Sequence, residues 1–181
     1  NDLEDYRIVK SSIDINDNFN CAHKLYFRLK EGKIGKRITS LDRARNIYGT
    51  HSTADFNGLT YYNHEVGLIT VGYNEQLVCF LEQLNRSYYF AALMLTNGKV
   101  LIYGFENGLK PKSYTVDLQG NSGVTVISLE TSKGSEESNQ PYFYTSASGN
   151  ESQDFENLFA DIAPFDLGDF NNDFNNDFFI T

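Results

Sequence analysis

Tryptophan is absent from this chain of 181 residues, methionine occurs once, and only two cysteines and three histidines are present. A structural zinc site needs three or four Cys or His ligands at short spacings. Cys21 and His23 are close in sequence, but no CxxC or HxxxH pair accompanies them. A disulfide-built scaffold needs a higher density of cysteines. We therefore expect no metal site and a fold that does not depend on disulfides.

Long apolar runs and an excess of basic residues are also missing. No stretch reaches the roughly 18 apolar residues that a membrane-spanning helix needs, so we expect no membrane span. The net charge is −9, and residues 151–181 hold eight of the 24 acidic residues and none of the 15 basic ones. Residues 1–150 then hold 16 acids against 15 bases. Because nucleic-acid binding needs a basic surface, we expect no direct contact with nucleic acid.

Coherent catalytic motifs are absent too. Cys79 could in principle pair with His51 or His64, but it lies in an apolar helical run, which favours a buried structural thiol. The segment 104–108 lacks the Gly-Lys-Ser/Thr ending of a phosphate loop and indicates a turn. The Asp/Asn cluster at 14–18 lacks the glycine and the closing glutamate of a calcium loop. We predict that the protein is not an enzyme and has no catalytic, cofactor-binding or metal-binding residues.

Aromatic and turn-forming residues are abundant. The chain has 14 Phe, 12 Tyr and 14 Gly, a composition that favours strands and turns over a helical bundle. Residues His23–Leu29 alternate between polar and apolar, as in a half-buried strand. The pair Asn97-Gly98 separates two apolar runs, at 88–95 and 100–105, and this pattern predicts a hairpin. We predict a mainly β fold, either a β-sandwich or a partly open barrel.

One segment has helical periodicity. Leu77, Leu81 and Leu84 share a face within residues 75–84, and Asn74 can cap the first turn. This pattern predicts one short amphipathic helix. The expected core consists of the apolar residues on one face of each periodic segment, namely Leu25, Phe27, Leu77, Leu81, Leu84, Leu93, Leu95, Leu101, Val124, Val126, Leu129 and Phe143.

The composition changes after residue 145. We predict a β-rich domain over residues 1–145, a linker over 146–153 and an extended, acidic, Phe-rich tail over 154–181. Phe155, Leu158, Phe159 and Ile162 have the spacing of a short helix, which needs a surface to pack against.

The tail residues suggest a binding role, because acids keep such a segment soluble while phenylalanines can anchor it. Docking on a neighbouring subunit or another protein is our first interpretation. Folding back over an apolar groove of the same chain, or an inert terminus, are the alternatives. The predicted partner-binding residues are Phe155, Leu158, Phe159, Ile162, Phe165, Phe170, Phe174, Phe178 and Phe179.

The stretch from Leu93 to Tyr144 contains NGKVLIYGFENGL, GNSGVTVISLE and QPYFYT, separated by polar loops. This order of strands and turns resembles structural proteins of tailed phages and prophages of Bacteroidetes. The resemblance implies a β-sandwich or barrel subunit that assembles into rings, as tail-tube, neck or capsid-associated proteins do. It brings no catalytic residues. The Phe-rich acidic tail is not part of the family's pattern.

The sequence therefore favours a non-enzymatic structural or assembly subunit located in a virion. Its expected partners are copies of itself, other virion proteins, or both. The alternative is a secreted or cell-surface β-sandwich module for adhesion or ligand binding, which the sequons at Asn85 and Asn150 would suit.

Overall fold

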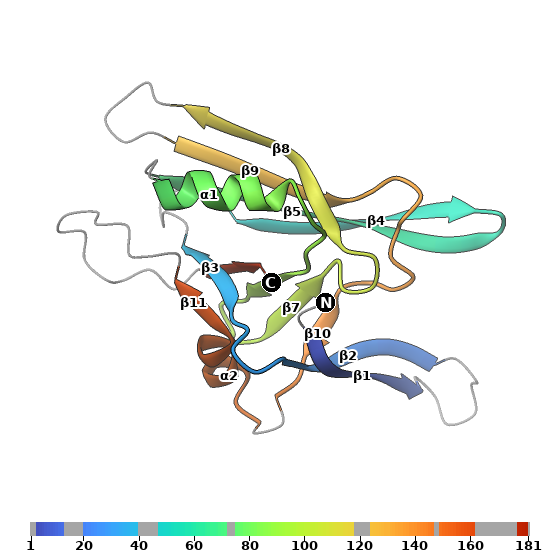
Figure 1. The fold of residues 1–181 in the computed structure, drawn as a ribbon. Helices are drawn as coiled ribbons and strands as arrows, with labels where there is room; N and C mark the ends of the chain where they lie inside the picture. Colours follow the sequence, from blue (N-terminus) through green and yellow to red (C-terminus); the bar gives the residue numbers. More distant parts are fainter. Residues whose placement is uncertain are drawn as a thin grey trace.

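The computed structural model describes residues 3–12, 20–39, 47–71, 75–117, 124–146, 149–161 and 177–180. It confirms the predicted mainly β fold, with two sheets and two short helices (Figure 1). The first sheet contains β1 (Leu3–Ser12), β2 (Asn20–Leu29), β3 (Gly35–Thr39), β6 (Ala91–Met94), β7 (Val100–Tyr103), β10 (Tyr142–Tyr144), β11 (Phe159–Asp161) and β12 (Asp177–Ile180). The second contains β4 (Tyr48–Phe56), β5 (Leu59–Val71), β8 (Leu109–Asp117) and β9 (Val124–Thr131). The helices are α1 (Glu75–Leu84) and α2 (Glu151–Leu158).

The first sheet has the order β1-β2-β10-β7-β6-β12-β3-β11. Its β10–β2 and β11–β3 pairs are parallel, and the others are antiparallel. The predicted hairpin joins β6 to β7, and the Lys99 N–H donates to the side chain of Asn97 at 3.1 Å. Gly98 has φ +78°, which suits the Asn-Gly turn.

The second sheet is antiparallel, in the order β4-β5-β9-β8. Strand β5 has 13 residues, of which 59–67 pair with β4 and 65–71 pair with β9. Asn57 and Gly58 connect β4 to β5 with positive φ angles of 52° and 78°. Among the described strands, no pairing closes either sheet into a barrel.

Helix α1 coincides with the predicted helix at 75–84. Leu77, Phe80, Leu81 and Leu84 are all buried, and they pack against β5 and β9 of one sheet and β6 and β7 of the other. The expectation of a buried thiol was wrong, because Cys79 lies off this apolar face and is exposed.

The core consists of two clusters of buried side chains. One lies around α1, and the other joins β2, β6, β7, β10 and α2. Burial is confirmed for seven predicted core residues, namely Leu25, Phe27, Leu77, Leu81, Leu84, Leu93 and Leu129. Leu95 and Leu101 are half-buried, and the side chain of Val124 lies outside the described part. The prediction was wrong for Val126 and Phe143, which are 40% and 39% exposed.

The stretch expected to be a linker, 146–153, already contains the first turn of α2. The side chain of Asn150 caps this helix by accepting from the Gln153 N–H at 3.2 Å. Phe155 on α2 and Phe159 on β11 are 1% and 4% exposed, with their ring centroids 5.0 Å apart. The start of the acidic segment therefore belongs to the second core cluster.

Candidate functional site

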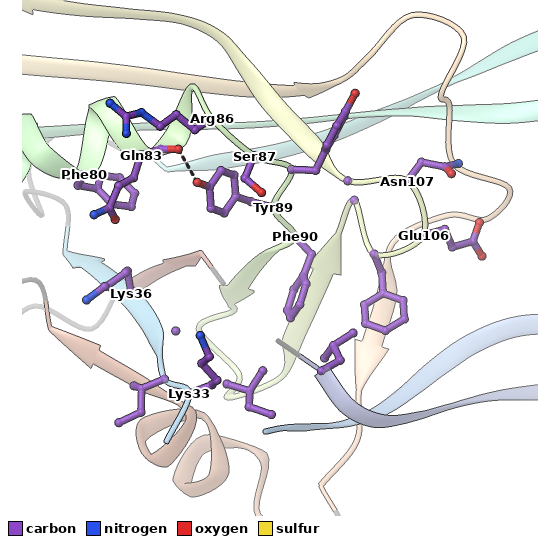
Figure 2. Close-up of a pocket in the computed structure, with 18 residues that line it drawn as sticks. Lys33, Lys36, Phe80, Gln83, Arg86, Ser87, Tyr89, Phe90, Glu106 and Asn107 are labelled. Atoms are coloured by element: carbon purple, nitrogen blue, oxygen red, sulfur yellow. Dashed lines mark hydrogen bonds between the residues drawn. The ribbon is translucent and has the colours of Figure 1, made fainter. Parts of the chain in front are cut away.

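A cleft of about 570 Å³ opens between the two sheets (Figure 2). Its walls come from residues 33–36 at the start of β3, the end of α1, the segment 86–90 and the turn 104–108 between β7 and β8. Leu3 of β1 and Leu29 of β2 complete the lining. These pieces are far apart in sequence, and the fold brings them together around the cleft. We call this feature the inter-sheet cleft. Its volume is in the range of small-molecule sites.

The charged groups of the inter-sheet cleft are unevenly distributed. Figure 2 shows Lys36 and Lys33 in the lower part of the view and Arg86 at the upper left, by the end of α1. The side chains of Phe80 and Gln83 lie between Arg86 and Lys36 in this view, and Glu106 lies on the right. The Glu106 carboxylate is engaged outside the cleft. It accepts from the Ser138 N–H at 2.9 Å and from side chains of Asn139 and Tyr142. Among the described residues that line the cleft, the charged side chains are therefore mainly basic.

Aromatic rings form the wall of the cleft between its basic residues and Glu106. Phe90 and Phe105 are half-buried, with centroids 5.6 Å apart. The Tyr89 hydroxyl donates to the carbonyl of Gln83 at 2.6 Å, and burial raises the pKa of this hydroxyl. Tyr88 is 50% exposed, and Lys110 Nζ lies 4.1 Å from the centroid of its ring. The wall is thus apolar and aromatic, with its rings tilted to each other and a further cation, Lys110, at its rim.

Two acids hold the turn at the far end of the cleft. The buried Glu137 carboxylate accepts from the N–H groups of Glu106, Asn107 and Gly108 at 2.9, 2.9 and 3.2 Å. Burial nevertheless raises the pKa of Glu137. These hydrogen bonds fix the position of the turn relative to the loop that carries Glu137.

His51 and His64 are directly opposite each other on β4 and β5, with ring centroids 6.4 Å apart. Nδ1 of the buried His64 accepts from the Gly104 N–H at 3.0 Å, so the neutral ring carries its proton on Nε2. A protonated nitrogen has no lone pair for a metal ion, so this arrangement does not suit a two-histidine metal site. Among the described residues, no cluster of three or more His, Cys, Asp and Glu has a metal-binding arrangement.

The hairpin of β4 and β5 carries exposed apolar residues at its tip. Phe56 and Leu59 flank the turn and are 68% and 60% exposed. Figure 1 shows this hairpin extending well away from α1. We call these two residues the hairpin tip.

The predicted partner-binding residues fall into three groups. Phe155 and Phe159 are buried in the protein's own core, and Leu158 packs against it. Phe178 and Phe179 lie on β12, which pairs with β6 and β3, but their side chains lie outside the described part. Ile162, Phe165, Phe170 and Phe174 lie outside the described residues. For Phe155 and Phe159, the contacts favour the intramolecular alternative.

Sequence reasoning did not identify the inter-sheet cleft. Lys36, Arg86 and Phe90 belong to separate segments with no shared periodicity, so no local pattern connects them. The Asn-Gly turn at 57–58 was a usable signal for the β4–β5 hairpin, because apolar residues flank it on both sides.

No protein-family model, curated protein or solved structure matches this chain. The resemblance to phage structural proteins therefore stays a prediction. No helix in the described part of the chain is long and apolar enough to cross a membrane.

Proposed function

We propose that this protein is a non-enzymatic assembly subunit, of the class that tailed phages build into their virions, and that it pairs with copies of itself through the edge of β4. The observation that carries this proposal is the contrast between β4 and the other edge strands. An unpaired strand edge can extend the sheet of a neighbouring molecule unless charges, prolines, bulges or short length prevent it.

Three of the four edge strands in the described part carry such protection. Strand β8 contains Pro111 with a lysine on each side and a register shift after it. Strand β1 carries several charged residues and two register shifts. Strand β11 has only three residues. None of these three edges favours a long intermolecular ladder.

Strand β4 lacks nearly all of these features. Its nine residues contain no Lys, Arg or Pro, and Asp55 is the only acid. It pairs with β5 from Tyr48 to Phe56 without a register shift, so its free edge is regular. Most of its side chains are exposed. A second copy could therefore add a strand to β4, and the exposed hairpin tip would bury apolar surface in the same contact.

Lysines on the free edge test this proposal. The double variant Ser52→Lys/Thr53→Lys puts a charge on each face of β4, where both native side chains are exposed. Sedimentation velocity over a wide concentration range should show an oligomer for the wild type and a monomer for the variant. Thr115→Lys on the protected edge strand β8 is the matched control and should leave the oligomer unchanged. A wild type that stays monomeric, or an oligomer that survives both lysines, would contradict the proposal.

The virion location needs a separate experiment. We expect mass spectrometry to detect the chain in phage particles purified after prophage induction. The alternative is a secreted or cell-surface module for adhesion or ligand binding. Recovery of the protein from the cell surface or culture medium, and not from particles, would favour this alternative.

A further inference from the structure

The inter-sheet cleft has no part in pairing through β4, and its chemistry points to a separate role. Lys36 and Arg86 form no salt bridge with a described carboxylate. Glu106, the acid among the lining residues, directs its oxygens to Ser138, Asn139 and Tyr142. In a chain with a net charge of −9, two basic side chains thus lie at one cleft without a salt bridge to the described acids. Like charges gathered in a concave site attract a ligand of opposite charge.

The inter-sheet cleft also contains apolar side chains that a ligand could cover. Ile34 and Tyr88 are 57% and 50% exposed, and Phe90 and Phe105 are half-buried, so a ligand would remove much of their apolar surface from water. Figure 2 shows the Phe90 ring between the side that carries Lys36 and the side that carries Glu106. A planar ring can stack or pack edge-on against such a wall.

We propose that the inter-sheet cleft binds a small organic anion with a planar aromatic body. Its carboxylate, sulfonate or phosphate group lies at the side of the cleft that carries Lys36 and Arg86, and its ring packs against Phe90 and Phe105. The volume of about 570 Å³ accommodates a ligand of two or three fused or linked rings.

Two fluorescent probes separate the anionic part of this proposal from the apolar part. The first is 8-anilinonaphthalene-1-sulfonate, and the second is N-phenyl-1-naphthylamine, which has the same rings without the sulfonate. We expect the wild type to bind the sulfonate probe more tightly than the neutral probe. Added salt should weaken the binding of the sulfonate probe only. Equal affinity for both probes would contradict a role for the cations.

Charge reversal at the cationic end is the direct test. Lys36→Glu/Arg86→Glu should weaken sulfonate binding at least about tenfold, since a hydrogen bond to a charged group is worth about that much, and should leave the neutral probe nearly unchanged. Lys24→Glu/Lys133→Glu is the matched control, because both lysines are exposed and lie outside the cleft. Equal losses in the two double variants would overturn the proposal by showing only a net-charge effect.

The position of the bound sulfonate probe can be determined in the wild type, so this result does not depend on how the variants fold. Backbone amide resonances should shift on sulfonate binding in residues 33–36, 86–90 and 104–108. Shifts confined to the hairpin tip, Phe56 and Leu59, would mean that the probe binds exposed apolar surface elsewhere, and the proposal would fail.

Discussion

Glu137 accepts a hydrogen bond from the N–H of Glu106 at 2.9 Å, and Glu106 in turn accepts from the N–H of Ser138, the residue after Glu137, at 2.9 Å. Each acid therefore fixes the loop that carries the other. Burial raises the pKa of Glu137, although the hydrogen bonds from the N–H groups of Asn107 and Glu106 act to lower it. Burial acts in the same direction on Glu106, but hydrogen bonds from Tyr142 and the 138–139 loop outweigh it and lower its pKa.

Removing the Glu137 carboxylate should destabilise the fold. Glu137→Ala leaves the N–H groups of residues 106–108 without their acceptor, and we expect a loss of about 2–5 kcal/mol in the free energy of unfolding. Glu137→Gln keeps an acceptor oxygen and should cost less. Urea denaturation at pH 7 measures both.

The neighbouring acid supplies the control for this prediction. Glu136 accepts from the Gly134 N–H within one exposed turn, so Glu136→Ala should cost less than about 1 kcal/mol. Equal losses at Glu136 and Glu137 would show that the bridging hydrogen bonds contribute nothing specific.

His64 should make stability depend on pH. Burial, followed by the nearby His51, lowers the pKa of His64 to about 4, while the Asn139 backbone and Glu106 act in the opposite direction. The unfolded chain binds a proton at this residue near pH 6.5 and the folded chain does not until about pH 4. The stabilisation is therefore complete above pH 6.5 and is lost as the pH falls toward 4, by about 1.4 kcal/mol per pH unit.

The variant His64→Asn isolates this dependence. An asparagine oxygen can replace Nδ1 as the acceptor of the Gly104 N–H and does not titrate. Free energies of unfolding measured between pH 7 and pH 5 should fall for the wild type and stay flatter for the variant. His51→Asn, at the exposed partner position, should keep most of the wild-type slope. A wild-type slope that persists in His64→Asn would assign the dependence to other groups.

The sequence predicted those elements whose pattern is local. Helix α1 follows from its apolar spacing, and the β6–β7 hairpin from the Asn97-Gly98 turn. In β9 the expected core residues did not share one face. The structure buries Thr125, Ile127 and Leu129 on one face and Ser128 on the other, and it leaves Val126 exposed.

Phe143 shows why hydrophobicity alone predicted the wrong buried face for β10. In β10 the tyrosines on either side are buried and the phenylalanine is not. The Tyr142 hydroxyl donates to Glu106 at 2.5 Å, so its polar atom is satisfied in the interior. That acceptor lies 36 positions earlier in the chain, and no local pattern reveals it. The inter-sheet cleft was missed for the same reason, since its cations come from separate segments.

The contrast between Phe155 and Phe143 gives a last test, because the sequence assigned Phe155 to partner binding and Phe143 to the core. Phe155 is 1% exposed within the second core cluster, so Phe155→Ala should lower the free energy of unfolding by about 3–5 kcal/mol. Phe143 is 39% exposed, and Lys99 Nζ lies 5.8 Å from the centroid of its ring. Phe143→Ala should therefore cost less than about 1 kcal/mol.

Denaturation and sedimentation on the same samples distinguish the two roles of Phe155. If α2 packs on its own chain, Phe155→Ala lowers the denaturation midpoint at every protein concentration, including those at which only monomer is present. If Phe155 instead anchors the tail on a neighbour, the variant keeps the monomer's midpoint and loses oligomer. The first outcome is expected, because Phe155 and Phe159 are already covered by residues of the same chain, leaving little surface for a partner to bury.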